Sequence, residues 1–217
     1  MSKYMGDFEN RDLLGADLDG ANLSGMDLSG FDMSRAKLNH ADLSWTNLRS
    51  ANLKEAYLNG ADFSGANLEY AKIPTSRLEG AILKNAKLHG VFMPYAFCHN
   101  ANFEGADLTS VDLVFAEFHD AKLLNTNFSY SNLGHTYFNR ADLRGAIFRG
   151  SGIIHTIFSE ADLRKVDFSQ VDLSPVDSGD RRGPRIYLDG SIYDEFTQWP
   201  SGFDPKPLGA KFVRSNA

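Results

Sequence analysis

The sequence predicts an all-β solenoid, in which short repeats stack along one axis. The first observation behind this prediction is an apolar residue at every fifth position from Phe8 to Leu173, which gives thirty-four consecutive units. The second is that this central residue is Leu in twenty units and Phe in nine, while the residue two positions before it is Ala in nineteen. Such self-similarity is typical of repeats that bury their apolar side chains only against neighbouring repeats.

The five-residue spacing also indicates the shape of one unit. An amphipathic helix needs apolar residues at steps of three and four, and a half-buried strand needs one at every second position. Here two inward residues stand two apart, as in Ala16 and Leu18, which suits a short extended segment. The unit often ends in glycine, as at Gly15 and Gly20, which suits a turn with a positive φ. Each unit is therefore expected to form one side of a square.

Units such as ADLDG, ANLSG, ADFSG and ADLRG resemble the pentapeptide repeat family. The resemblance extends over residues 6–175, about four fifths of the chain. It implies a right-handed quadrilateral parallel β-helix of about eight to nine coils, with four units per coil and residues twenty apart stacked on one another. At about 4.8 Å per coil, the rod would be about 40 Å long. In that register six phenylalanines form two inner stacks: Phe118, Phe138 and Phe158, and Phe128, Phe148 and Phe168.

The five-residue register breaks after Leu173, and this break divides the chain. Residues 1–173 are expected to form the β-helix. Residues 174–185 contain Gly, Pro and three Arg, and are expected to form an exposed inserted loop. The register resumes around Leu188 and Tyr193, so residues 186–217 are interpreted as a final pair of repeats and an irregular capping tail. An uncapped solenoid end would expose apolar side chains and unpaired backbone groups.

The apolar residues are spread along the chain and are not concentrated in one segment. No run of about eighteen apolar residues occurs, and the first residues, MSKYMGDFENRD, lack an apolar stretch of signal-peptide length. We therefore expect a cytoplasmic protein with no membrane span. The single cysteine, Cys98, allows no intrachain disulfide, and its place among the central residues predicts a small buried side chain.

The sequence carries no motif that indicates catalysis. It has no glycine-rich phosphate loop, no nucleophile elbow and no Cys/His spacing typical of a metal site. The position before the central residue holds thirteen Asp and seven Asn, so neighbouring carboxylates arise from the repeat itself. We therefore predict a protein that is not an enzyme and uses no cofactor.

Two histidine pairs occupy equivalent outward positions on adjacent predicted coils. His99 and His119 form the first, beside Asp120, and His135 and His155 form the second. Imidazoles stacked about 5 Å apart can share a metal ion, since neutral histidine is the commonest transition-metal ligand. The alternative is a coincidence among six surface histidines. The sequence leaves both interpretations open.

The acidic balance bears on one function that the resemblance implies. Some pentapeptide repeat proteins protect DNA gyrase from quinolones as rods that mimic duplex DNA. Residues 1–173 here carry 22 Asp and Glu against 16 Lys and Arg. That excess is far below the charge of duplex DNA, about one negative charge per 1.7 Å. DNA mimicry with binding to gyrase or topoisomerase is therefore the alternative hypothesis, and no direct binding of nucleic acid is expected.

The leading hypothesis is a rigid scaffold or interaction module that binds an unidentified protein. It depends on a cluster of outward apolar residues, which is a candidate partner surface: Phe92, Pro94, Tyr95, Phe97, Val114 and Phe115. The partner is either another protein or a second copy of this chain, in an end-to-end or face-to-face dimer. One competing interpretation is that Trp199 and Phe203 of the tail fold back over this cluster. Another is that Pro74 and Pro94, one coil apart in equivalent turns, mark turn geometry alone.

Overall fold

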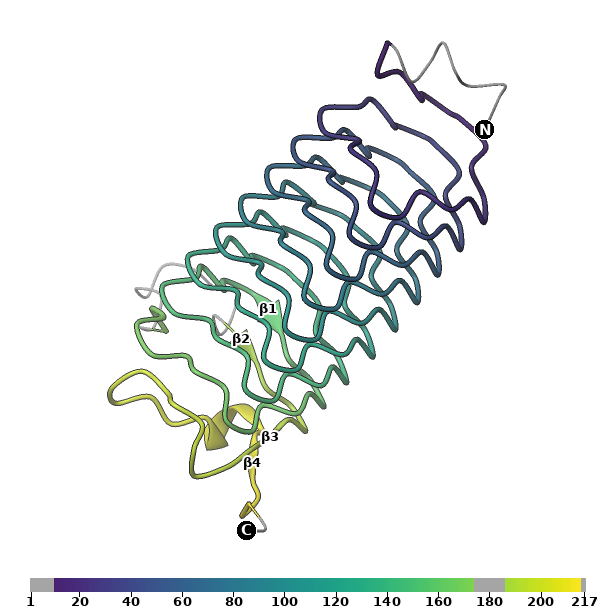
Figure 1. Cartoon of the computed structure of the whole chain (residues 1–217). Helices are drawn as coiled ribbons and strands as arrows, with labels where there is room; N and C mark the ends of the chain where they lie inside the picture. Colours follow the sequence, from purple (N-terminus) through teal and green to yellow (C-terminus); the bar gives the residue numbers. More distant parts are fainter. Residues whose placement is uncertain (1–9, 174–185, 216–217) are drawn as a thin grey trace.

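The computed structural model describes residues 10–173 and 186–215, which form a straight stack of coils ending in an irregular C-terminal segment (Figure 1). Residues 1–9, 174–185 and 216–217 lie outside the described part of the chain. The inserted loop predicted at residues 174–185 therefore lies outside the described residues.

Successive coils pair through a parallel backbone ladder with a twenty-residue register. The ladder begins with the bridge between Asp12 and Asp32 and continues to the bridge between Ile147 and Asp167. Each side of the square is so short that most of the pairing consists of isolated bridges. The predicted right-handed quadrilateral β-helix is confirmed, and its register fixes which side chains meet on the surface.

The longer elements lie at the C-terminal end: β1 (Thr156–Ile157), β2 (Ile186–Tyr187), β3 (Ile192–Tyr193), the 3-10 helix η2 (Lys206–Leu208) and β4 (Lys211–Phe212). β1 pairs in parallel with β2, and β3 pairs in parallel with β4 (Figure 1). Thr156 lies opposite Ile186, thirty residues later, so one coil of the ladder carries ten additional residues. Within the described ranges, no helix has the length and apolar character needed to cross a membrane.

The core is a column of stacked side chains along the axis of the rod. Both predicted phenylalanine stacks are confirmed, with ring centroids 5.3 Å apart in one (Phe118, Phe138 and Phe158) and 5.0 Å apart in the other (Phe128, Phe148 and Phe168). Parallel stacking of this kind fills a narrow interior with aromatic contacts. Cys98 is fully buried, and burial, followed by the charge of Glu117, raises the pKa of its thiol far above the usual range. Its thiol is therefore protonated and unreactive.

The turns explain why Asp and Asn are so frequent. The Asp12 side chain accepts a hydrogen bond from the Leu14 amide at 3.0 Å, and the Asn22 side chain accepts one from the Ser24 amide at 3.0 Å. The same contact recurs along the rod, so these side chains satisfy turn amides that would otherwise lack a partner. The abundance of carboxylates is therefore structural in origin.

Every fifth residue adopts the left-handed conformation, whether or not it is glycine. Trp45, for example, has a φ of 58°, and Tyr130 has a φ of 62°. At some turns a glycine leaves room for a ring from the adjacent coil to lie across it. A Cβ on Gly65 would lie 2.6 Å from the Trp45 ring. The four corners of the rod therefore present outward side chains in vertical columns.

The described tail lies across the C-terminal end of the rod (Figure 1). The Trp199 ring stacks on Phe168, the last ring of its inner stack, with centroids 4.9 Å apart and planes at 12°. Phe203 in turn packs against Trp199 at 5.3 Å, and the Thr197 hydroxyl donates to the Leu163 carbonyl at 2.9 Å. The interpretation that Trp199 and Phe203 cover the outward cluster near Phe92 is therefore wrong.

Candidate functional site

One corner of the rod carries a column of four stacked rings, Tyr95, Phe115, His135 and His155, which we call the corner ladder. All four residues occupy left-handed turn positions, with φ between 57° and 59°. Tyr95 and Phe115 stack at 5.1 Å, and Phe115 and His135 stack at 4.7 Å. The His135 and His155 rings lie 5.0 Å apart and are tilted at 32°. The corner ladder therefore arises from the twenty-residue register, which places one ring from each coil above the next.

The structure places most of the predicted partner surface at this corner. Phe92, Tyr95 and Phe97 are exposed, at 46%, 51% and 41% of their full accessibility. Phe115 and Val114 are half-buried, and Phe115 is shielded because a ring of the corner ladder lies on either side of it. Phe92 and Phe97 lie on the two sides of the square that meet at Tyr95. The three exposed rings therefore flank one corner, on two sides of the rod.

Pro94 does not belong to this surface. The sequence places it among the outward residues, but the structure buries it. Its carbonyl accepts the Thr75 amide at 3.0 Å, and its ring lies in a turn column between Pro74 and Val114. A short ring held against the backbone loses its access to water when bulky residues flank it on both neighbouring coils. The prediction for Pro94 is therefore wrong.

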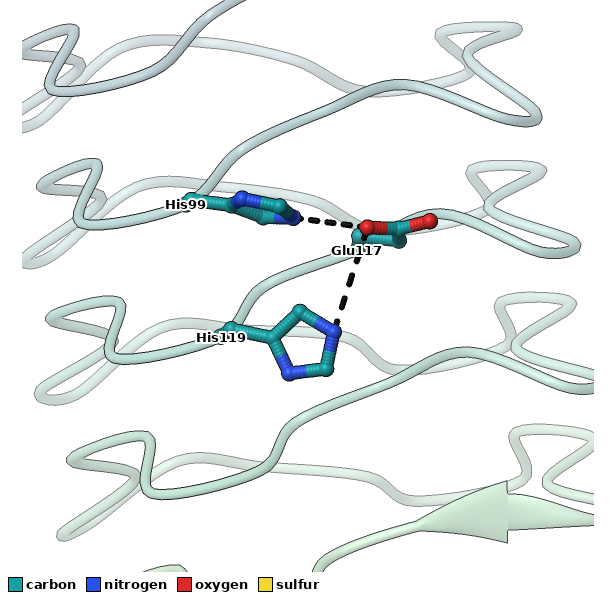
Figure 2. A group of neighbouring side chains, drawn as sticks. All are labelled: His99, Glu117 and His119. Atoms are coloured by element: carbon teal, nitrogen blue, oxygen red, sulfur yellow. Dashed lines mark hydrogen bonds and ion pairs between the residues drawn. The ribbon is translucent and has the colours of Figure 1, made fainter.

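The neighbouring side of the coil carries a second group of side chains, His99, Glu117 and His119, which we call the His–Glu cluster (Figure 2). The Nε2 atom of His99 lies 2.7 Å from Oε2 of Glu117, and Nε2 of His119 lies 3.9 Å from the same oxygen. The two imidazole centroids are 5.0 Å apart. All three side chains are half-buried and point toward one another (Figure 2).

The carboxylate beside these histidines differs from the one that the sequence indicates. Asp120 forms two hydrogen bonds with the Arg140 guanidinium, at 2.8 and 2.6 Å, and these hold the pKa of Asp120 below its usual value. Glu117 fills the place expected for Asp120. The sequence does carry a sign of this contact. Glu117 and His119 stand two residues apart, and residues two apart in an extended segment point to the same side.

The environment of His119 favours its neutral form. Burial lowers the pKa of its imidazole, and the charge of His99 lowers it further, while the charge of Glu117 raises it. A neutral imidazole keeps a lone pair free to accept a proton or to bind a metal ion. The His–Glu cluster can therefore form hydrogen bonds or ligate a cation.

The second predicted histidine pair has a different setting. His135 and His155 belong to the corner ladder, and they line a shallow hollow of about 290 Å³ together with Tyr137, Ile157 and Tyr187. Among the described residues, the His–Glu cluster is the one group of three or more His, Cys, Asp or Glu with ligand atoms close enough for a metal. The two histidine pairs therefore differ in chemistry despite their equal spacing.

Another hollow, of about 570 Å³, lies between the tail and an opposite corner of the rod. Its lining includes Arg144 and Arg164, which form ion pairs at 2.6 Å with Asp142 and 2.5 Å with Asp162. Both ion pairs lie within the rod. The Asp194 side chain, which also lines the hollow, accepts the Lys165 amide at 3.0 Å and so joins the C-terminal segment to the rod.

Comparison with solved structures supports the fold. QnrB1, a plasmid-mediated fluoroquinolone resistance protein, is 16% identical, with 93% of this chain and 91% of that chain covered and a TM-score of 0.54. HetL, a pentapeptide repeat protein involved in heterocyst differentiation regulation from the cyanobacterium Nostoc sp. strain PCC 7120, is 24% identical. The match to HetL covers 88% of this chain and 91% of the HetL chain, with a TM-score of 0.42. The similarity to QnrB1 concerns the architecture of the rod alone.

Sequence comparison identifies the family. No curated protein sequence matches the chain significantly. A family model described as pentapeptide repeats matches repeatedly, over the segments 7–35, 16–54, 32–65, 46–85, 61–94, 81–123 and 121–151. Because the matched segments cover more than half of its length, this chain belongs to the pentapeptide repeat family.

Proposed function

We propose that this protein is a non-enzymatic, rigid interaction module that binds a partner protein at the corner of the rod formed by Phe92, Tyr95 and Phe97. The single observation that carries this proposal is the exposure of these three rings at one corner, at 46%, 51% and 41%. Aromatic side chains are enriched at protein interfaces, and a contiguous exposed apolar patch marks an interaction surface more often than scattered residues do.

The backbone beneath these rings is held in place before any partner arrives. The Phe92 amide donates to the Ala71 carbonyl at 3.0 Å, and the Tyr95 amide donates to the Val114 carbonyl at 3.0 Å. Binding to a surface of this kind orders few additional groups, so little conformational entropy opposes it. Rigidity therefore supports a docking role for this corner.

The arrangement of charges favours this proposal over DNA mimicry. Acidic side chains along the rod pair with basic ones on adjacent coils: Glu55 with Arg35 at 2.7 Å, and Asp120 with Arg140 at 2.6 Å. In each pair the positive charge offsets the negative one. A DNA-like field needs about one uncompensated negative charge per 1.7 Å. The whole chain has a net charge of only −6.

The first test is capture of the partner from the cell of origin with the double variant Tyr95→Ser, Phe97→Ser. The matched control is Trp45→Ser, Tyr130→Ser, which removes two exposed rings, at 73% and 69% accessibility, from other corners of the rod. We expect the Tyr95/Phe97 variant to lose a protein that both the wild type and the control retain. Light scattering of the same samples identifies the case in which the partner is a second copy. Equal capture by all three proteins would contradict the proposal.

The second test addresses the alternative function. We expect micromolar protein to give no protection of gyrase supercoiling from a quinolone at about physiological ionic strength, because charges more than about 8 Å apart are screened there. QnrB1, the fluoroquinolone resistance protein, serves as the positive control. Protection by this protein under the same conditions would make DNA mimicry the better hypothesis.

A further inference from the structure

We propose that His99, Glu117 and His119 form a binding site for a divalent transition metal ion, with zinc as the ion that this donor set favours. The set consists of two imidazole nitrogens and one carboxylate oxygen, and their ligand atoms lie within 4.8 Å of one another. Two histidines and one glutamate are a known set of protein ligands for zinc. The cluster shares its side of the rod with Phe97, whose ring contacts that of His99, but the inference does not depend on the proposed partner.

The two distances from the histidine nitrogens to the Glu117 oxygen lie on either side of the ligand spacing in a tetrahedral site. Metal–ligand bonds of about 2.1 Å place the ligand atoms of a tetrahedral zinc ion about 3.4 Å apart. The His99–Glu117 distance of 2.7 Å is shorter than this value, and the His119–Glu117 distance of 3.9 Å is longer. Because all three side chains are half-exposed, small side-chain rotations equalise these distances without moving the core. An ion between the three atoms would replace the hydrogen bond between His99 and Glu117.

Backbone hydrogen bonds between coils fix the three ligands relative to one another. The Cys98 amide donates to the Glu117 carbonyl at 2.7 Å, and the Asn100 amide donates to the His119 carbonyl at 2.9 Å. The residues that carry these amides flank His99. Ligands held on rigid elements need little reorganisation, which favours metal binding.

Neighbouring side chains restrict the two imidazoles and limit the positive charge around them. The His99 ring contacts Phe97 edge-on at 6.4 Å, and the His119 ring contacts Tyr137 at 5.8 Å. The nearby Arg140 donates two hydrogen bonds to Asp120, so its charge is compensated. Glu117 supplies a negative charge where a cation would sit. Such surroundings orient metal ligands and increase their affinity.

The protein contains its own control for this proposal. His135 and His155 have the same spacing as His99 and His119, with ring centroids 5.0 Å apart in both pairs. Tyr137, which lies one coil from Glu117 in the same column, lines the hollow beside the second pair, and no carboxylate is grouped with that pair among the described residues. If two imidazoles with centroids 5.0 Å apart were sufficient to bind a metal ion, both pairs would bind it. If the carboxylate is required, only the His–Glu cluster will.

The test uses the full-length chain purified without a histidine tag. Zinc affinity is measured by titration calorimetry, and cobalt is added separately because its visible absorption reports four-coordinate binding with nitrogen ligands. We expect one ion per chain for the wild type. Since one of three ligands is lost, Glu117→Gln and His119→Asn should each weaken zinc affinity at least tenfold. The double variant His135→Asn, His155→Asn should bind as the wild type does.

Thermal melts without metal establish that each variant is folded, which is expected because the substituted side chains lie outside the core. The proposal is overturned if the wild type binds neither zinc nor cobalt at millimolar concentration. It is also overturned if folded Glu117→Gln binds zinc as tightly as the wild type. Loss of binding in the His135/His155 variant alone would assign the ion to the corner ladder, and would equally overturn it.

Discussion

Leu108→Asp is expected to unfold the middle of the rod. Leu108 is fully buried, and it lies in an inner column between Leu88 and Phe128, which are also fully buried. Its amide donates to the Asn127 carbonyl at 2.8 Å, and its carbonyl accepts the Ser131 hydroxyl at 2.8 Å. An unpaired carboxylate at this position should lower the free energy of unfolding by about 4 kcal/mol or more. Because each coil is a template for the next, the loss should extend to neighbouring coils.

Thermal unfolding followed by circular dichroism measures this effect. The matched control is Leu108→Met, which conserves volume and should cost less than about 1.5 kcal/mol. Asp107, one residue earlier, is exposed in the wild type, so a carboxylate is tolerated when it points outward. A melting temperature for Leu108→Asp within a couple of degrees of the wild type would show that the inward register is wrong.

The regular part of the fold could be predicted because one physical requirement repeats along the chain. Each unit must bury its central side chain, and in this sequence only the five-residue spacing places an apolar residue at every such position. The stack of Phe118, Phe138 and Phe158 follows directly from four units per coil, and the structure confirms it. Likewise, the burial of Cys98 follows from its place among the central residues. Inward positions hold apolar residues because they are buried, so the apolar pattern of the sequence identifies them.

The outer surface is harder to predict because nothing in the repeat fixes its contacts. Pro94 occupies an outward position, yet its neighbours on two adjacent coils bury it. Asp120 is adjacent in sequence to His119, but its carboxylate is engaged by Arg140 instead. Glu117 then provides the carboxylate of the His–Glu cluster. Such contacts depend on competition among side chains from different coils, which the repeat pattern does not encode.

The left-handed turns show the same limit. Glycine at the end of a unit indicates a positive φ, but aromatic residues such as Tyr95 and Phe115 adopt it as well, at 57° and 59°. Their own preference is for other conformations. Closure of the coil imposes the turn on whichever residue stands there, so the corner ladder follows from the fold and not from local propensity.

Deleting residues 186–217 is expected to make the rods associate end to end, because we propose that this segment caps the last coil. Phe168 would lose the Trp199 ring that lies 4.9 Å from it. The amides of Phe168 and Leu163 would lose their acceptors, the carbonyls of Gln198 and Ile192, each at 2.8 Å. An exposed apolar end with unpaired backbone groups is a template for pairing with another chain. Light scattering should therefore report particles larger than those of the wild type, increasing with concentration.

Two substitutions at Trp199 separate the covering ring from the rest of the tail. Trp199→Ala removes the ring from Phe168 and should lower the free energy of unfolding by about 3 kcal/mol. Trp199→Phe keeps a ring there and removes an indole N–H that is buried without a hydrogen-bond partner among the described atoms, so it should behave as the wild type does. A deletion that keeps the wild-type particle size at high concentration would show that the end of the rod needs no cover. Because Phe168 and Leu163 would then face water without causing association, the tail would have to serve another purpose.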